Sequence, residues 1–126
     1  MDAREKLARD GEDLAARHLQ AQGYRILGRR VRTRLGEIDI LAEQGGRVVF
    51  IEVKTRRTAA FGRPAEAVDA RKLGSIRRCA ALLLRDRKEL RGREARIDII
   101  ELVWPEGGAP ALDHLEDAVD ADSTSR

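Results

Sequence analysis

Residues 36–54, Gly-Glu-Ile-Asp-Ile-Leu-Ala-Glu-Gln-Gly-Gly-Arg-Val-Val-Phe-Ile-Glu-Val-Lys, contain two β-rich runs on either side of Gly45-Gly46. Adjacent glycines readily adopt the positive φ angles of a two-residue turn, so this stretch is predicted to form a β-hairpin. In that register Gln44 pairs with Arg47, and the later pairs follow in antiparallel order.

Side chains alternate across a strand, so the hairpin register sorts the residues into two faces. Asp39 lies directly across from Glu52, and Glu37 across from Lys54, on a face that also carries Leu41 and Phe50. The other face is an apolar strip that suits a core, with the pairs Ile38–Val53, Ile40–Ile51 and Ala42–Val49.

The opposed carboxylates of Asp39 and Glu52 are the unusual feature of this hairpin. Directly opposed side chains lie about 5 Å apart, and like charges there are destabilising. At an effective dielectric constant near 20 the repulsion is ~3 kcal/mol. A divalent cation would compensate for it, because hard cations prefer carboxylate oxygens. The alternative is that both are ordinary solvent-facing charges and Lys54 neutralises one of them.

The other elements are predicted from hydrophobic periodicity and turn residues. Their order predicts an α/β domain of three layers over residues 1–119, with a mixed central sheet flanked by helices. The expected segments are an amphipathic helix (2–22), an irregular edge strand (24–33), a basic loop (55–64), a second helix (65–87), a charged connection (86–94), a buried strand (96–103), a turn (105–110), a short strand or turn (111–119) and a frayed acidic and polar tail (120–126).

Three side chains on the predicted helices are open to two interpretations. Glu12 lies beside the apolar stripe of the first helix and points either toward a neighbouring sheet or into solvent, which the periodicity favours. His18 lies on that stripe and is read as a core or edge histidine rather than a catalyst. Lys72 could reach a phosphate, but a solvated position is the commoner outcome for a helical lysine.

The charge of the chain is unevenly distributed. The net charge is +3, but residues 101–126 hold seven acidic residues and one arginine, which leaves 24 basic and 15 acidic residues in 1–100. An arginine-rich, basic body indicates a polyanionic partner, nucleic acid first, although a GC-rich genome also yields such a composition. Aromatic residues make up 3% of the chain. Duplex or branched backbones therefore fit better than single strands stacked on aromatic rings.

Several classes are disfavoured by composition. Cys79 is the single cysteine and the chain has two histidines, which gives no zinc-site spacing and suggests no Ser–His or Cys–His nucleophile. The charged amino terminus is followed by no apolar segment typical of a signal peptide, and no apolar run is long enough to span a membrane. We therefore expect a cytoplasmic protein with no membrane partner.

The acidic pair with a nearby lysine is the set of groups that metal-assisted phosphodiester hydrolysis needs. Asp39 and Glu52 would hold Mg²⁺, which borrows further oxygens from water and substrate phosphate. Lys54 would orient or help to deprotonate the attacking water. Arg56 and Arg57 would grip the nucleic-acid backbone.

A family resemblance rests on motifs that occur in order along the chain: Gly11-Glu12, Gly23-Tyr24, Gly36-Glu37-Ile38-Asp39-Ile40-Leu41, Val49-Phe50-Ile51-Glu52-Val53-Lys54-Thr55-Arg56, Lys72 and Arg96-Ile97-Asp98. From about residue 4 to residue 119 the chain resembles the YraN-like uncharacterised family. That family is similar to the PD-(D/E)xK, or restriction-endonuclease-like, nuclease superfamily and in particular to archaeal Holliday-junction resolvases.

The resemblance implies a restriction-endonuclease-like fold and a set of site residues. Asp39 and Glu52 would be ligands of Mg²⁺ or Mn²⁺, the backbone carbonyl of Val53 a further ligand, and Lys54 the catalytic lysine. Glu12 would complete the site, which reverses the solvent-facing interpretation. The proline that names the motif is absent, since Ile38 precedes Asp39. Nucleic acid would be bound by Arg56, Arg57, Arg71 and Lys72.

These observations lead to the hypothesis of a metal-dependent, structure-selective DNA endonuclease. A homodimer would suit it, because cutting two strands of a branch calls for two sites. The alternative is a non-catalytic nucleic-acid-binding accessory protein with a vestigial or structural metal site. RNA is a third and weaker option for the substrate.

Overall fold

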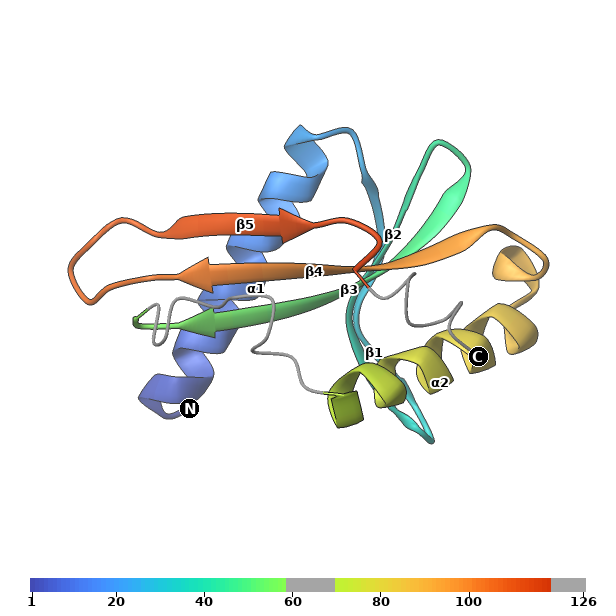
Figure 1. The fold of residues 1–126 in the computed structure, drawn as a ribbon, viewed down its shortest axis with the longest axis horizontal. Coiled ribbons are helices and arrows are strands. Elements are labelled where there is room, and N and C mark those ends of the chain that lie inside the picture. Colours follow the sequence, from blue (N-terminus) through green and yellow to red (C-terminus); the bar gives the residue numbers. More distant parts are fainter. Residues whose placement is uncertain (59–69, 119–126) are drawn as a thin grey trace.

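Figure 1 shows the computed structural model, which describes residues 1–58 and 70–118. Both helices and all the strands expected from sequence are present where the chain is described. The predicted tail (120–126) and the start of the second predicted helix (65–69) lie outside the described residues. In chain order the elements are α1 (Ala3–Ala21), β1 (Arg25–Thr33), β2 (Gly36–Gln44), β3 (Arg47–Arg56), α2 (Ala70–Asp86), the 3-10 turn η3 (Lys88–Leu90), β4 (Ala95–Val103) and β5 (Ala111–Leu115).

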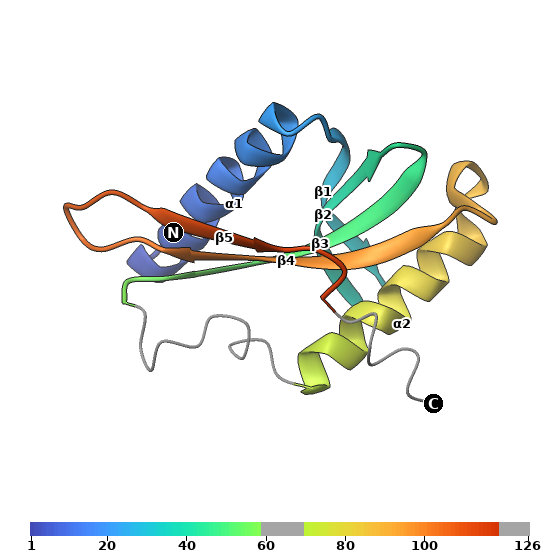
Figure 2. The same ribbon diagram turned by 45° about the horizontal axis from the view of Figure 1, so that its top comes forward.

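The five strands form one mixed sheet in the order β1-β2-β3-β4-β5. Neighbouring strands are antiparallel except β3 and β4, which are parallel. A parallel pair needs a crossover connection, and α2 lies in it. Figure 2 shows α1 on one face of the sheet and α2 on the other. The expected three-layer α/β domain is therefore confirmed. In the described part of the chain, no helix is long and apolar enough to cross a membrane.

The sheet carries a hydrophobic core on each face. Consecutive residues of β3 alternate between them, so Phe50 packs on the α2 side and Ile51 on the α1 side. Leu19 of α1 and Leu83 of α2 contribute from the two helices. Aliphatic residues supply most of both cores, as the scarcity of aromatic residues predicts.

The hairpin register is confirmed from Gln44↔Arg47 to Ile40↔Ile51, but one face assignment is wrong. Ile38 packs on the α2 side, not with Ile40 on the α1 side. The regular pairing of β2 with β3 ends at Ile40↔Ile51. The preceding residues of β2, from Gly36 onward, pair with β1 alone. Opposite this point, Arg30 of β1 has φ 52°. A positive φ in a strand marks a local irregularity that turns side chains to the other face.

The predicted basic loop also begins later than expected. Thr55 and Arg56 belong to β3, because the parallel pairing with β4 continues as far as Arg56↔Val103. This extension holds the end of β3 rigidly beside α1, where the pocket described below is formed.

Helix α1 approaches β3 most closely at Gly11. A Cβ atom at this position would overlap Oγ1 of Thr55 and would lie 2.9 Å from the Cβ of that residue. Only glycine therefore allows the helix to pack at this distance, and Glu12 is buried beside the sheet as a result.

We expect Gly11→Ala to lower the free energy of unfolding, although alanine is the better helix former by about 1 kcal/mol. Overpacking costs typically 1–3 kcal/mol, which outweighs that gain. Chemical denaturation checks the sign, and Thr55→Ala in the same chain should recover part of the loss. Gly74→Ala in α2 is the matched control, because the nearest atom there is the flexible Arg78 Nη1 at 3.4 Å. It should stabilise; equal effects at both glycines would contradict the close-approach explanation.

Candidate functional site

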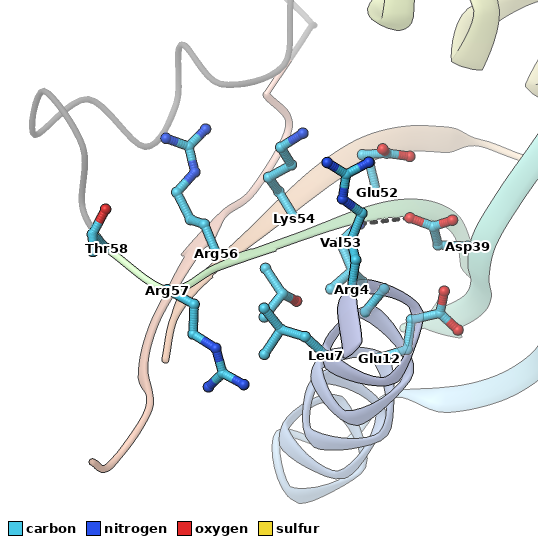
Figure 3. Close-up of a pocket in the computed structure, with 12 residues that line it drawn as sticks. Arg4, Leu7, Glu12, Asp39, Glu52, Val53, Lys54, Arg56, Arg57 and Thr58 are labelled. Carbon is cyan, nitrogen blue, oxygen red and sulfur yellow. Dashed lines mark hydrogen bonds between the residues drawn. The ribbon is translucent and has the colours of Figure 1, made fainter. Parts of the chain in front are cut away.

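The predicted site residues come together in a pocket of about 690 Å³ between the amino-terminal half of α1 and the end of β3 (Figure 3). Seven of the residues expected from sequence line it: Glu12, Asp39, Glu52, Val53, Lys54, Arg56 and Arg57. Arg4, Leu7, Ala8, Thr55 and Thr58 complete the lining. Lys72 reaches the site through Glu52, whereas Arg71 is exposed on α2 and does not line the pocket.

Asp39 lies where β2 separates from β3. Its Oδ2 accepts a hydrogen bond from the backbone N–H of Val53 at 2.9 Å, shown as the dashed line in Figure 3. Burial raises the pKa of the Asp39 carboxyl, and the hydrogen bond from Val53 opposes that shift. The Val53 amide thus fixes the carboxylate, while the expected role of the Val53 carbonyl stays a prediction.

Glu52 is buried, with 7% of its surface exposed. Its Oε2 lies 3.5 Å from the ammonium group of Lys72, whose side chain is 50% exposed, so Lys72 is solvated and also faces Glu52. Its Oε1 is buried without a hydrogen-bond partner among the described residues. Burial, and then the neighbouring charge of Asp39, raise the pKa of Glu52 to about 8. A second negative charge beside Asp39 is therefore unfavourable at this buried position.

Glu12 is also buried, which corrects the solvent-facing interpretation drawn from periodicity. Arg30 Nε lies 3.1 Å and Arg29 Nη2 3.6 Å from its Oε1. Burial, followed by the charge of Asp39, raises the pKa of Glu12, and the two arginines lower it. The charge of Asp39 therefore acts on Glu12, while Glu12 forms ion pairs with Arg29 and Arg30 of β1.

A divalent hard cation fits this donor set through Asp39 and Glu52. Oε1 of Glu52 has no hydrogen-bond partner within the described part of the chain, and ionising Glu52 beside Asp39 is unfavourable without a cation. Within residues 1–58 and 70–118, no three His, Cys, Asp or Glu side chains are grouped closely enough to hold a metal by themselves. Mg²⁺ commonly uses one or two carboxylates and fills its other positions with water and phosphate oxygens. Two carboxylates are therefore sufficient.

A buried acid beside Lys54 was missed by the sequence reasoning. Glu101 of β4 pairs with Lys54 in the parallel register and has 1% of its surface exposed. Its Oε2 lies 3.1 Å from Arg56 Nε. Burial raises the pKa of Glu101, while Arg56 and then Lys54 lower it. Glu101 thus anchors the two cations that follow Glu52 along β3, and Figure 3 shows Glu52, Lys54 and Arg56 on one side of that strand.

Arg4 was also missed, although the sequence contained a signal for it. Arg4, Ala8 and Glu12 are spaced at i, i+4 and i+8, which places them on one side of a helix, and all three line the pocket. With Arg57, whose Nη1 donates to the Trp104 carbonyl at 3.1 Å, Arg4 contributes to a basic rim around the acidic pair.

The fold is a three-layer α/β domain with a mixed sheet, and its pocket holds an acidic pair made of the half-buried Asp39 and the buried Glu52. The family model described as Uncharacterised protein family UPF0102 matches residues 11–102. The chain belongs to this family, which is the YraN-like family that the motifs indicated.

Relatives in distant bacteria resemble the chain over most of its length. A UPF0102 protein of Arthrobacter sp. (strain FB24) is 44% identical over 91% of this chain and 97% of its own. Those of Syntrophomonas wolfei and Persephonella marina are 40% and 38% identical over 86% and 90% of this chain, and over 92% and 93% of their own. Their names state the family and no activity, so function is argued from the site.

Proposed function

We propose that this protein is a Mg²⁺- or Mn²⁺-dependent endonuclease that hydrolyses DNA phosphodiester bonds, with a preference for branched structures. The observation that carries the proposal is the pair formed by the half-buried Asp39 and the buried Glu52, with Lys54 two residues further along β3. Oε1 of Glu52 is buried and has no hydrogen-bond partner among the described residues. A module that only binds nucleic acid has little reason to retain a repulsive pair of this kind.

Asp39 and Glu52 would hold the metal ion, with the Val53 carbonyl as a further ligand. When bound, the ion would lower the pKa of a coordinated water and stabilise negative charge on the phosphoryl oxygens. Glu12 would complete the site from the α1 side. Arg29 and Arg30 form ion pairs with Glu12. Glu12 would therefore stabilise the metal ion by its negative charge, and it would coordinate the ion directly only after leaving these arginines.

Lys54 would orient the attacking water, help to deprotonate it and offset the negative charge that develops on the phosphate. Side chains two residues apart on a strand share a side, so Lys54 and Glu52 face the same substrate. Glu101, directly opposite on β4, would position Lys54 and Arg56 by its charge.

DNA would be held by the arginines of the pocket rim. Arg4 and Arg57 line the pocket, and Arg71 and Lys72 extend the basic surface along α2. Such contacts to phosphate position a duplex without reading its sequence. A branched substrate brings several backbones to one place, which suits recognition by charge and shape. Cleavage of two strands in one branch would require two chains, so a homodimer is part of the proposal.

A nucleic-acid-binding accessory protein is the second candidate, and one observation favours it. The carboxylates are partly neutralised by cations of the protein itself, Glu52 by Lys72 and Glu12 by Arg30. If these pairs persist in the presence of metal, the acidic group would be structural and the basic rim would remain available for binding.

Incubation with labelled four-way junction, flap, duplex and single-stranded DNA in Mn²⁺ distinguishes the two candidates. We expect cleavage of the branched substrates, and Lys54→Ala should reduce it by on the order of 10²–10³-fold with binding nearly retained. Lys88→Ala, in the turn after α2 and away from the pocket, is the matched control and should cut normally. Branched DNA that is bound but never cut would favour the accessory protein.

A further inference from the structure

A second pocket, of about 390 Å³, shares no lining residue with the acidic site. It lies at the carboxyl-terminal end of α1, next to β5, and both histidines of the chain point into it (Figure 1 shows the two elements). The lining residues are His18, Gln22, Tyr24, Gln44, His114 and Glu116. The proposed nuclease activity uses none of them.

The two imidazoles face each other through ring nitrogens. Nε2 of His18 lies 3.3 Å from Nδ1 of His114, and the rings are arranged edge to face at 74°. On its other side, Nε2 of His114 lies 2.8 Å from Oδ2 of Asp98. A carboxylate accepts hydrogen bonds, so the His114 proton belongs on Nε2 and its Nδ1 presents a lone pair to the pocket.

Asp98 is fixed in place to orient His114. It is fully buried, and Arg96 Nε and the backbone N–H of Asp117 both donate to its Oδ1 at 2.9 Å. A buried carboxylate that accepts the far N–H of an imidazole is the arrangement that orients metal-binding histidines and raises their basicity.

The separation of the two nitrogens matches the geometry of a metal chelate. Zinc–nitrogen bonds are about 2.0–2.1 Å long and zinc is tetrahedral, so two imidazole nitrogens on one ion lie roughly 3.3–3.4 Å apart. The observed 3.3 Å falls on this value. Binding an ion at the pocket would then require both rings to rotate, so that their lone pairs turn from each other toward the ion, with little change in the separation of the two nitrogens.

Glu116 offers a third ligand. It lies two residues after His114, in the turn that follows β5, and both side chains line the pocket. Its side chain is 60% exposed, and its present contacts are weak, with Tyr24 Oη at 3.5 Å and Arg96 Nη2 at 3.8 Å. A rotation of this exposed side chain is needed for coordination, because no three such groups are yet in place within the described residues.

We propose that His18, His114 and Glu116 form a binding site for a divalent transition metal of the Zn²⁺ class, oriented by Asp98 and completed by water. The His18 proton passes from Nε2 to Nδ1 through solvent, so both rings stay neutral and nothing is oxidised or reduced. Imidazole ligands select Zn²⁺, Co²⁺ or Ni²⁺ over Mg²⁺, which distinguishes this site from the carboxylate pair. The ion would join the end of α1 to β5 across 96 residues of sequence.

Zn²⁺ titration of the chelator-treated full chain, followed by calorimetry and by thermal melting, tests the proposal. In millimolar Mg²⁺, which would occupy the carboxylate pair of Asp39 and Glu52, we expect one Zn²⁺ per chain with micromolar or tighter affinity and a rise in Tm. With Co²⁺ in place of Zn²⁺, the intense visible absorption of a tetrahedral site should appear. Absence of stoichiometric binding would leave only a hydrogen bond between two histidines and overturn the proposal.

Variants localise the ion. His18→Gln should weaken Zn²⁺ binding at least tenfold and remove the Co²⁺ spectrum. Glu116→Gln, at an exposed position where folding is not at risk, should weaken binding about tenfold, whereas Glu106→Gln in the β4–β5 turn should change nothing. Asp39→Asn should leave Zn²⁺ affinity intact. Unchanged affinity in both His18→Gln and Glu116→Gln would place the ion elsewhere and contradict the assignment.

Discussion

Replacing Asp39 by asparagine should reduce metal-dependent cleavage of branched DNA by on the order of 10³-fold, while the DNA is still bound. The amide oxygen of asparagine can accept the Val53 hydrogen bond that holds Asp39, so the strand geometry should survive. What is lost is one negative charge and one oxygen ligand of the ion. DNA affinity should stay equal or rise slightly, because the substitution removes a negative charge from the pocket that the basic rim surrounds.

The measurement separates binding from chemistry. Single-turnover cleavage at saturating protein gives the rate of the chemical step, and a binding titration in Ca²⁺ gives the affinity. Glu37→Gln is the matched control, since Glu37 lies two residues earlier on β2, is partly exposed beside Arg32 and does not line the pocket. Its rate should remain within about threefold of the wild type. An Asp39→Asn variant that cuts normally would remove Asp39 from the site.

Replacing Glu52 by glutamine should stabilise the metal-free protein at alkaline pH. The pKa of Glu52 is about 8 in the folded chain and 4.5 as a free group. Below pH 4.5 the carboxyl is protonated in both states and costs nothing. Between pH 4.5 and 8 the unfolded state ionises freely and the folded state does not, so stability falls as the pH rises. The loss is at most roughly 5 kcal/mol, and glutamine does not titrate.

Urea unfolding at pH 5, 7 and 9 in the presence of a chelator measures this difference. The two proteins should agree near pH 5, and the variant should be the more stable at pH 9. Adding Mn²⁺ at pH 9 should restore the wild type and leave the variant unchanged, because the ion replaces the missing positive charge. A difference that is the same at every pH would mean that Glu52 is not held in its raised-pKa environment.

The hairpin could be predicted because its determinants are local. Gly45-Gly46 sets the turn, the turn sets the register, and alternation assigns most side chains to a face. The assignment fails at Ile38 because the regular pairing of β2 with β3 ends at Ile40, and Arg30 of the neighbouring strand β1 has a positive φ next to this point. Such an irregularity depends on a neighbouring strand and leaves no periodic signal within the hairpin itself.

What local sequence patterns could not supply are the features that tertiary contacts create. Periodicity favoured a solvent-facing Glu12, and only the family resemblance placed it in the site; it is buried because Gly11 lets α1 approach Thr55. Glu101 is beside Lys54 only through the parallel pairing of β3 with β4. His18 and His114 are 96 residues apart in sequence, and only the fold brings their rings together. Local ligand spacing therefore could not indicate this pair.

The claim on which the proposed function depends is that Asp39 and Glu52 share a divalent cation. The most direct test is the anomalous difference map of crystals of the full chain grown with Mn²⁺, measured near the manganese absorption edge. We predict one peak within coordination distance of carboxylate oxygens from both residues, and no peak there in Glu52→Gln. A map without such a peak at saturating Mn²⁺, or one with an equal peak in the variant, would contradict the account.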